Sequence, residues 1–405
     1  MMVPMTTDAF EPPLTDDPLD PSAPVVVKIQ EPGDLLAMVG HTLGYTPTRS
    51  LVLIGLHGTR TGAHLRLDLS PAAEDPVALA VAAARYLSGP DVPSPPAAVV
   101  ALLYVDHAPA PPRHDDPWMR PYAGLCEALR SVFEGSLGID VFQIWQVGGG
   151  YARDYDCLDA ACCPFPGTPV GSASGSLVDT HMVYQGSMIA HTPEEIAEEM
   201  LLPHQAVDPS LSTSIRRELQ MLRSRETPPA PEDALPLWEV ALESCPSVED
   251  LAAVEQWLAE NVDVVALILR SLQHNTVRDA VLVLAAQDLR TAQSAGELFR
   301  QTLTGSTGSA PRLDRMERAS VLCRVLLALG DRYSVPELLS MVSWIEWAKG
   351  RGAVAGVLLD RVIAAAPGHQ LTELLSTAVN TGMICPWARV TAQSWSEYSR
   401  TSSAP

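Results

Sequence analysis

Residues 51–56, Leu51-Val52-Leu53-Ile54-Gly55-Leu56, form an uninterrupted apolar run, and the alternating stretch Leu65-Arg66-Leu67-Asp68-Leu69 follows soon after it. A short continuous apolar run is typical of a strand buried on both faces. Alternation with a period of two is typical of a half-buried strand. Gly58 and Gly62 lie between the two stretches and favour a turn. The sequence therefore predicts a β-hairpin at the centre of a sheet.

Helical and strand-like patterns alternate on both sides of this hairpin. Apolar spacing predicts helices over 35–43, 75–87 and 119–133, and strands over 98–105 and 139–147. Alternating strands and helices indicate an α/β sheet with helices packed on it. Because the hairpin adds an antiparallel pair, we expect the sheet to be mixed.

Beyond Pro193 the apolar pattern is helical throughout, and no strand pattern follows. The segment 227–231, Thr-Pro-Pro-Ala-Pro, is the clearest linker in the chain. The predicted organisation has five parts: a disordered tail over 1–24, an α/β domain over 25–192, connecting helices over 193–226, a helical domain over 232–390, and a flexible tail over 391–405.

The last helices carry a partial repeat signature. Ala355, Leu359 and Pro367 follow Gly350 at intervals that are similar to the second helix of a tetratricopeptide repeat. The first helix of the pair lacks the Trp and Gly positions of that pattern. We therefore expect a partly tetratricopeptide-like helical domain with one repeat-like unit.

The charge balance limits the classes of partner. The 405 residues carry a formal net charge of −21, and we find no cluster of basic residues of the kind that binds phosphate backbones. We therefore expect no nucleic-acid binding, and we expect another protein as the partner. The longest apolar stretches, such as 97–105, are about half of a membrane span, so we expect no membrane insertion.

The cysteine content points to a reducing compartment. The chain has seven cysteines, an odd number in a long chain, which argues against a disulfide framework. The first residues have no apolar core of a signal peptide. The sequence thus predicts a cytoplasmic protein.

Three of the cysteines, Cys157, Cys162 and Cys163, lie within the segment 155–164 and are followed by Pro164. They could be structural cysteines in a turn at the sheet edge, ligands of a metal, or redox or nucleophilic groups. Thiolates are zinc ligands, and His181 could add one more. The spacing matches no established zinc pattern, and neighbouring Cys162 and Cys163 are expected to point at one ion only with backbone strain. We therefore expect a buried structural turn with no catalytic metal and no required cofactor, and keep zinc as the alternative.

No other segment assigns a catalytic residue. Residues 148–150, three glycines, are followed by a strand-like pattern, which favours a hairpin turn over a phosphate-binding loop. Residues 171–175, Gly-Ser-Ala-Ser-Gly, do not fit the nucleophile-elbow pattern, because alanine stands at the centre. His41, His57, His64 and His107 lie near element ends, and the sequence pairs none of them with a nucleophile.

Several of these motifs resemble one family. Residues 43–56 (LGYTPTRSLVLIGL), residues 65–69 (LRLDL) and residues 157–169 (CLDAACCPFPGTP) are similar to an actinobacterial family catalogued as domain of unknown function 4192. Trp347, Gly350 and Pro367 extend the resemblance into the helical part. Many members have Phe where Tyr45 stands. The resemblance implies no activity, cofactor or catalytic residue.

Two functions remain open on these observations. The first is a non-enzymatic interaction or scaffold protein that acts through its helical domain, since stacked helices offer extended binding surfaces. The alternative is a metal-dependent or thiol-dependent enzyme centred on the α/β domain and its cysteine cluster. The absence of a convergent acid, base and nucleophile in the sequence favours the first, so we expect no enzyme.

Overall fold

The structure is a computed structural model of the 405-residue chain. It describes residues 31–58, 60–89, 92, 94–111, 120–184, 187–190, 192–201, 207–225, 227–390, 393–395 and 398–399. The contacts within the chain divide it into two compact units, 1–189 and 190–405. Among the described residues, no helix combines the length and the apolar character needed to cross a membrane.

The first unit is built on one six-stranded sheet in the order β2-β1-β3-β4-β5-β6. β3 and β4 are parallel, and every other neighbouring pair is antiparallel, so the sheet is mixed as predicted. The strands are β1 (Ser50–His57), β2 (Arg60–Asp68), β3 (Ala98–Tyr104), β4 (Asp140–Gly148), β5 (Tyr151–Asp154) and β6 (Thr168–Pro169). The predicted hairpin of β1 and β2 is confirmed, with Leu53 opposite Leu65.

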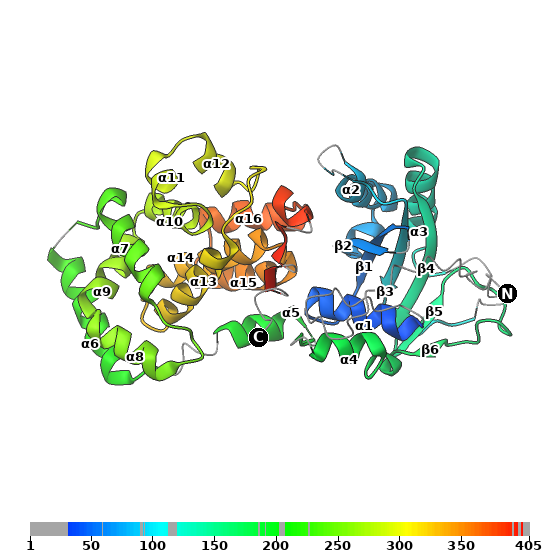
Figure 1. The fold of residues 1–405 in the computed structure, drawn as a ribbon, viewed down its shortest axis with the longest axis horizontal. Helices are drawn as coiled ribbons and strands as arrows, with labels where there is room; N and C mark the ends of the chain where they lie inside the picture. The colour runs from blue at the N-terminus through cyan, green and yellow to red at the C-terminus, as the bar shows by residue number, and fades with distance from the viewer. Residues whose placement is uncertain are drawn as a thin grey trace, which may run out of the picture. The chain divides into compact units, whose positions relative to one another are not determined.

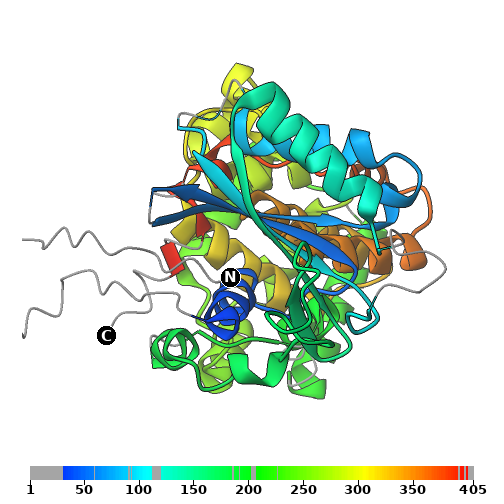
Figure 2. The same cartoon turned by 90° about the vertical axis from the view of Figure 1, so that its right-hand side faces the viewer.

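Helices cover both faces of the sheet (Figure 2). On one face, α1 (Pro32–Leu43) packs Leu36 and Val39 against Val52, Ile54 and Leu102. On the other face lie α2 (Pro76–Ser88) and α3 (Ala123–Arg130), which contact each other and the sheet. Because β1 and β3 are covered twice, their side chains are buried on both sides, which explains the continuous apolar run that predicted them.

The glycine turn between β4 and β5 also behaves as predicted. Gly149 has φ +57° and Gly150 has φ +85°, and β4 and β5 continue the hairpin with Gly148 opposite Tyr151. Two successive positive φ angles are typical of the two-residue turn that suits the twist of a hairpin. The segment is therefore a turn, and the same strand pair leads directly into the cysteine-containing loop.

All regular elements that the structure describes in the second unit are helical (Figure 1). The α-helices are α5 (Pro193–Leu201), α6 (Pro209–Arg225), α7 (Pro231–Ser244), α8 (Leu251–Glu260), α9 (Val262–Ser271), α10 (Asn275–Ala286), α11 (Leu289–Ser294), α12 (Glu297–Leu303), α13 (Leu313–Leu327), α14 (Ser334–Ala348), α15 (Gly352–Ala365) and α16 (Gln370–Asn380). Thr192 caps α5 by accepting a hydrogen bond from the Glu195 amide at 3.2 Å. Helix α10, with Leu282 and Leu284 fully buried, lies in the centre of the core.

The division between the units differs from the predicted organisation in one respect. Helices α5 and α6, predicted to connect two domains, pack within the second unit, where Ile215 and Leu219 of α6 join its core. The division falls between Ile189 and Ala190, and the Pro-rich segment 227–231 only separates α6 from α7. The prolines separate helix α6 from helix α7. Helix α6 belongs to the second unit because its apolar face is buried in the core of that unit.

Part of the predicted C-terminal tail is packed on the second unit. Trp395 and Tyr398 contact its core, and the Lys349 ammonium lies 4.1 Å from the centroid of the Trp395 ring. The aromatic rings of these two residues give the segment its apolar contact. The small polar residues around them in the sequence favoured the prediction of a flexible tail. The predicted tail over 1–24 and the β-branched run 25–29 lie outside the described residues.

Candidate metal centre and two histidine clusters

The cysteine cluster lies on the loop between β5 and β6, and Arg153 of β5 anchors this loop. The Arg153 Nε donates a hydrogen bond of 3.0 Å to the carbonyl oxygen of Cys163, and its guanidinium lies 3.7 Å from the centroid of the Phe165 ring. Arg153 is buried, so these contacts form in a region of low dielectric and are strengthened by it. The side chain therefore holds the second half of the loop against the sheet.

Two aspartates fold the loop locally through turns in which a carboxylate accepts backbone N–H groups. Asp154 Oδ1 accepts from the amides of Asp156 and Cys157 at 2.8 and 3.2 Å. Asp159 Oδ1 accepts from the amide of Ala161 at 2.8 Å, and its carbonyl oxygen accepts from the amide of Cys163 at 2.8 Å. Such turns are the usual local role of aspartate. They bring residues 157 and 162–163 to the same side of the loop.

The result is a cluster of three thiols. The Sγ atoms of Cys157, Cys162 and Cys163 all lie within 4.8 Å of one another, and those of Cys162 and Cys163 are 3.8 Å apart. Two sulfurs bound to one tetrahedral zinc at about 2.3 Å each are separated by about 3.8 Å. The Cys162–Cys163 distance thus matches one edge of a zinc tetrahedron. All seven cysteines of the chain are thiols and none is in a disulfide.

The thiols differ in their acidity. The Cys163 thiol donates a hydrogen bond to the sulfur of Cys162, and this contact, together with one from Cys157, holds the pKa of exposed Cys162 below its ordinary value. Burial raises the pKa of Cys163 to about 12. Cys162 therefore deprotonates more readily than Cys163, and thiolates are the form that binds metals.

The neighbouring carboxylates are engaged in holding the loop. Asp154 Oδ2 accepts a hydrogen bond from Gln143 Nε2 at 2.9 Å, and Asp156 forms an ion pair with Arg130. Burial raises the pKa of Asp156. Because each carboxylate has a structural partner, the three sulfurs are the groups of this loop that are best placed for a ligand.

The structure corrects two premises of the sequence prediction for this segment. Cys162 is exposed, and Cys157 and Cys163 are half-buried, so the three do not serve as buried apolar residues in a turn. The neighbouring sulfurs of Cys162 and Cys163 do point to one place, because the turn at Asp159 reverses the chain just before them. His181, on α4 (Leu177–Tyr184), is not a member of the cluster.

The remaining cysteines follow the prediction of core positions. Cys126, Cys323 and Cys385 are buried, and Cys245 is half-buried beside the helical core. Burial raises the pKa of Cys126, Cys245 and Cys323 to about 12. These four thiols are protonated at neutral pH and behave as small apolar residues.

A second polar cluster in the first unit joins α1 to the region of α4. The imidazole of His41 lies between a carboxylate and a hydroxyl: its Nε2 is 3.0 Å from Asp179 Oδ1, and its Nδ1 is 2.9 Å from Ser187 Oγ. The His41 side chain is 1% exposed. These residues are far apart in the sequence, which explains why the sequence paired His41 with no nucleophile.

The carboxylate of this cluster is held in place from the opposite side. Asp179 Oδ2 accepts a hydrogen bond of 2.7 Å from the amide of Gly175, and this bond, followed by the contact with His41, holds the pKa of Asp179 below its ordinary value. Asp179 is therefore ionised at neutral pH. Its amide in turn donates to Ser176 Oγ at 3.1 Å. The segment 171–175, which the sequence suggested only as a false nucleophile motif, thus helps to fix Asp179.

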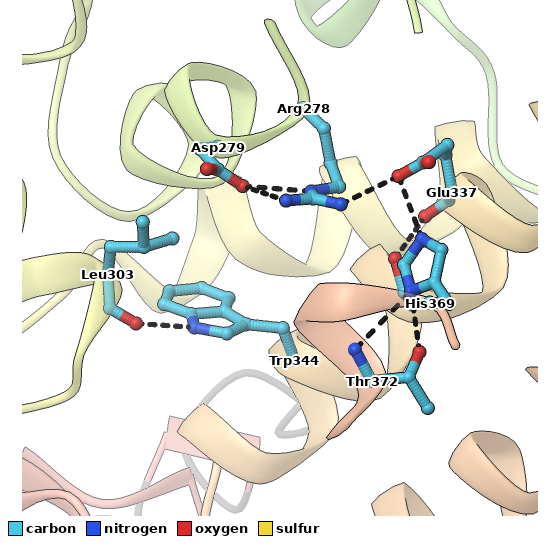
Figure 3. A network of polar contacts seen from close by, with 8 residues as sticks. Arg278, Asp279, Leu303, Glu337, Trp344, His369 and Thr372 are labelled. Carbon is cyan, nitrogen blue, oxygen red and sulfur yellow. Dashed lines mark hydrogen bonds and ion pairs between the residues drawn. The ribbon is translucent and has the colours of Figure 1, made fainter. Parts of the chain in front are cut away.

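The second unit contains a similar arrangement (Figure 3). His369 Nδ1 lies 2.7 Å from Thr372 Oγ1, and its Nε2 lies 3.1 Å from Glu337 Oε2. Arg278 donates to the same Glu337 oxygen at 2.9 Å and also pairs with Asp279 at 2.7 Å. Burial favours the protonated form of Glu337, but His369 and the charge of Arg278 together hold its pKa below the ordinary value.

Comparison with known proteins identifies the family. A family model described as a domain of unknown function, DUF4192, matches residues 32–384. The chain belongs to this family. The match covers the sheet, the thiol loop and the helices through α16. No curated protein and no solved structure matches the chain.

Proposed function

We propose that this DUF4192 protein binds a thiophilic divalent metal, zinc, through Cys157, Cys162 and Cys163. The observation that carries the proposal is the convergence of the three sulfurs within 4.8 Å of one another. Thiolate ligands select soft and borderline metals, and the 3.8 Å edge between Cys162 and Cys163 fits tetrahedral zinc. The zinc alternative of the sequence prediction thereby becomes the favoured function.

Three protein ligands leave one position of a tetrahedral metal for another group. In zinc proteins, a closed structural site has four protein ligands, and a catalytic site has three with water or substrate in the fourth position. Because Cys162 is exposed, the fourth position would face solvent. The zinc would therefore be accessible to water, to a small ligand or to a side chain of a partner.

Zinc content of the purified chain tests the proposal most directly. We expect about one zinc per chain by elemental analysis after metal loading and desalting, and less than half of that in the Cys162→Ser variant. Cys245→Ser, which alters a half-buried thiol outside the cluster, is the matched control and should keep the metal. Cobalt loading should add a thiolate-to-metal charge-transfer band that Cys162→Ser loses. Wild-type protein that retains no zinc or cobalt would overturn the proposal.

Metal binding should also release protons, because the thiols must become thiolates. Cys163, whose pKa is raised to about 12, is protonated in the apo protein and must lose its proton. We therefore expect zinc affinity to rise with pH across the neutral range. A titration at two pH values in buffers of different ionisation enthalpy measures the number of protons released.

A second candidate function is binding of another protein by the helical unit. Leu374 of α16 is 72% exposed and Ile363 of α15 is 43% exposed, and these two helices pack on each other. Exposed large apolar side chains mark interaction surfaces when they cluster, and the net charge of −21 favours a basic partner over nucleic acid. A partner that is captured by the wild type but not by Leu374→Asp would support this function. Equal capture by both would argue against it.

We place either function in the cytoplasm, where thiols stay reduced. The seven thiols support this location. Fractionation with an antibody against the chain tests it, and recovery of the protein from an oxidising compartment would contradict it.

A further inference from the structure

We propose that Ser187 is a nucleophile, that His41 activates it as a general base, and that Asp179 orients His41. The substrates are carboxylic esters with an apolar acyl group. The site is separate from the thiol cluster and does not depend on metal binding. It rests on the unbroken chain of contacts from Asp179 Oδ1 to His41 Nε2 at 3.0 Å and from His41 Nδ1 to Ser187 Oγ at 2.9 Å.

The surroundings fix the direction of proton transfer along this chain. Asp179 is ionised and only accepts hydrogen bonds, so the proton of a neutral His41 lies on Nε2. Nδ1 then carries a lone pair toward the hydroxyl of Ser187. A serine hydroxyl facing the basic nitrogen of a carboxylate-oriented imidazole has the arrangement of an activated nucleophile.

The position of Asp179 is independent of the histidine. The Gly175 amide holds the other carboxylate oxygen at 2.7 Å, so the carboxylate does not need His41 to stay in place. His41 is buried on α1, a helix that is packed on the sheet. Both the orienting carboxylate and the base are thus preorganised, while Ser187 is half-buried.

Exposed apolar side chains flank the serine along the chain. Tyr184 is 89% exposed and Met188 is 81% exposed, and Val183 and Leu177 of α4 are also exposed. Exposed large apolar side chains that lie close together mark ligand or partner surfaces. Their sequence proximity to Ser187 points to an acyl chain as the group that they contact.

The reaction is written as acyl transfer to water. Ser187 Oγ attacks the ester carbonyl carbon while its proton passes to His41 Nδ1, and the C–O bond to the alcohol breaks as that alcohol takes the proton. Water then loses a proton to the same nitrogen and attacks the acyl carbon. The bond from that carbon to Ser187 Oγ breaks, the proton on Nδ1 returns to Oγ, and the carboxylic acid is released. The net reaction consumes one ester and one water and needs no further reactant.

A fluorophosphonate probe with peptide mass spectrometry tests the nucleophile. We expect covalent labelling of Ser187, loss of that label in Ser187→Ala, and retained labelling in Ser174→Ala, an exposed serine of the nearby loop. Since general-base catalysis contributes about 100-fold or more, His41→Gln should slow labelling by a similar factor. Circular dichroism of each variant checks the fold.

Two further variants keep the test decisive if His41→Gln does not fold. Asp179→Asn retains the shape of the side chain but favours the opposite tautomer of His41, so labelling should fall strongly in a variant that stays folded. Ser187→Cys should react with iodoacetamide faster than exposed Cys162 does. Unlabelled Ser187 in the folded wild type would overturn the proposal, as would labelling that is unchanged in both His41→Gln and Asp179→Asn.

Hydrolysis of p-nitrophenyl esters tests the substrate class. We expect the butyrate to be hydrolysed at least tenfold faster than the acetate, and Met188→Ser to reduce that preference. Equal rates for the two esters in the wild type would overturn the assignment of an apolar acyl group.

Discussion

His41 and His369 form the same three-part pattern in the two units, a carboxylate, an imidazole and a hydroxyl. The distances are similar: 3.0 and 2.9 Å around His41, and 3.1 and 2.7 Å around His369. Their surroundings are different. Thr372 is 1% exposed, whereas Ser187 is half-buried. The same local geometry therefore serves packing where the hydroxyl residue is enclosed, and we expect it to be available for chemistry where that residue is half-buried.

The two carboxylates also differ in exposure, and Glu337 is more enclosed than Asp179. Glu337 is paired with Arg278, which is itself 5% exposed, so the second cluster contains a nearly dry ion pair (Figure 3). His369 also caps α16, because its Nδ1 accepts from the Thr372 amide at 3.3 Å. Asp179 instead is partly exposed and is held by one backbone amide. Fixed charge and backbone caps are features of a structural cluster, and an imidazole that contacts a half-buried hydroxyl is a feature of a reactive one.

The largest expected effect is the loss of the ion pair in the second unit. Arg278→Ala leaves the Glu337 carboxylate buried without its charge partner, which costs about 3–5 kcal/mol of unfolding free energy. Urea unfolding monitored by hydrogen exchange of α10 and α14 peptides measures it. Arg300→Ala, which removes an exposed pair with Glu297, is the control and should cost less than about 1 kcal/mol. Similar losses in both variants would show that the Arg278 cluster does not stabilise the unit.

A smaller effect is expected at the histidine of the first unit. His41→Ala removes two hydrogen bonds, one of them to a charged group, and should cost about 1–3 kcal/mol. Asp179 keeps the Gly175 amide and water, so its charge is not left unpaired. Hydrogen exchange should rise in α1 and α4 peptides and stay unchanged in α10 and α14. A loss as large as that of Arg278→Ala would remove the distinction between the clusters.

The fold was largely predictable from the sequence because its elements carry strong local signals. Three signals each have one physical interpretation, and the structure confirms all three: the buried apolar run of β1, the alternation of β2, and the turn at Gly149 and Gly150. The helix α2 and the strands β3 and β4 lie within one residue of their predicted bounds for the same reason.

The sites were less predictable because their geometry arises in space. The three cysteines were recognised from their composition, but only the turns at Asp154 and Asp159 show that the sulfurs converge. The relay of His41 joins residues separated by 138 and 146 positions, so no sequence window contains it. The serine-rich segment at 171–175 contributes a backbone amide, which is a role that side-chain motifs do not reveal.

Acid should weaken both clusters, and more strongly the buried one. The pKa values of Glu337 and Asp179 are held below their ordinary values, so the unfolded chain takes up their protons first as pH falls. Their stabilising contributions are therefore present above the ordinary carboxyl pKa of about 4 and are lost as pH falls through the folded-state values. The stability difference between wild type and Glu337→Gln should shrink from pH 7 to pH 3, and that for Asp179→Asn should shrink less. A difference that is constant with pH would contradict the ionised state of these carboxylates.

The smallest expected effect compares the two hydroxyls directly. Thr372→Val replaces an enclosed hydroxyl by a methyl group and leaves His369 with one hydrogen bond fewer, so it should cost about 1 kcal/mol or more. Ser187→Ala should cost less than about 0.5 kcal/mol, because water can replace the hydroxyl at His41 Nδ1. Functional residues are selected for chemistry and add little stability. A reactive serine is therefore expected to lie at hydrogen-bond distance from an oriented imidazole and yet to contribute little to the free energy of unfolding. Urea unfolding of the two variants in parallel measures the difference, and a cost for Ser187→Ala equal to that for Thr372→Val would mean that Ser187, like Thr372, is a packing residue.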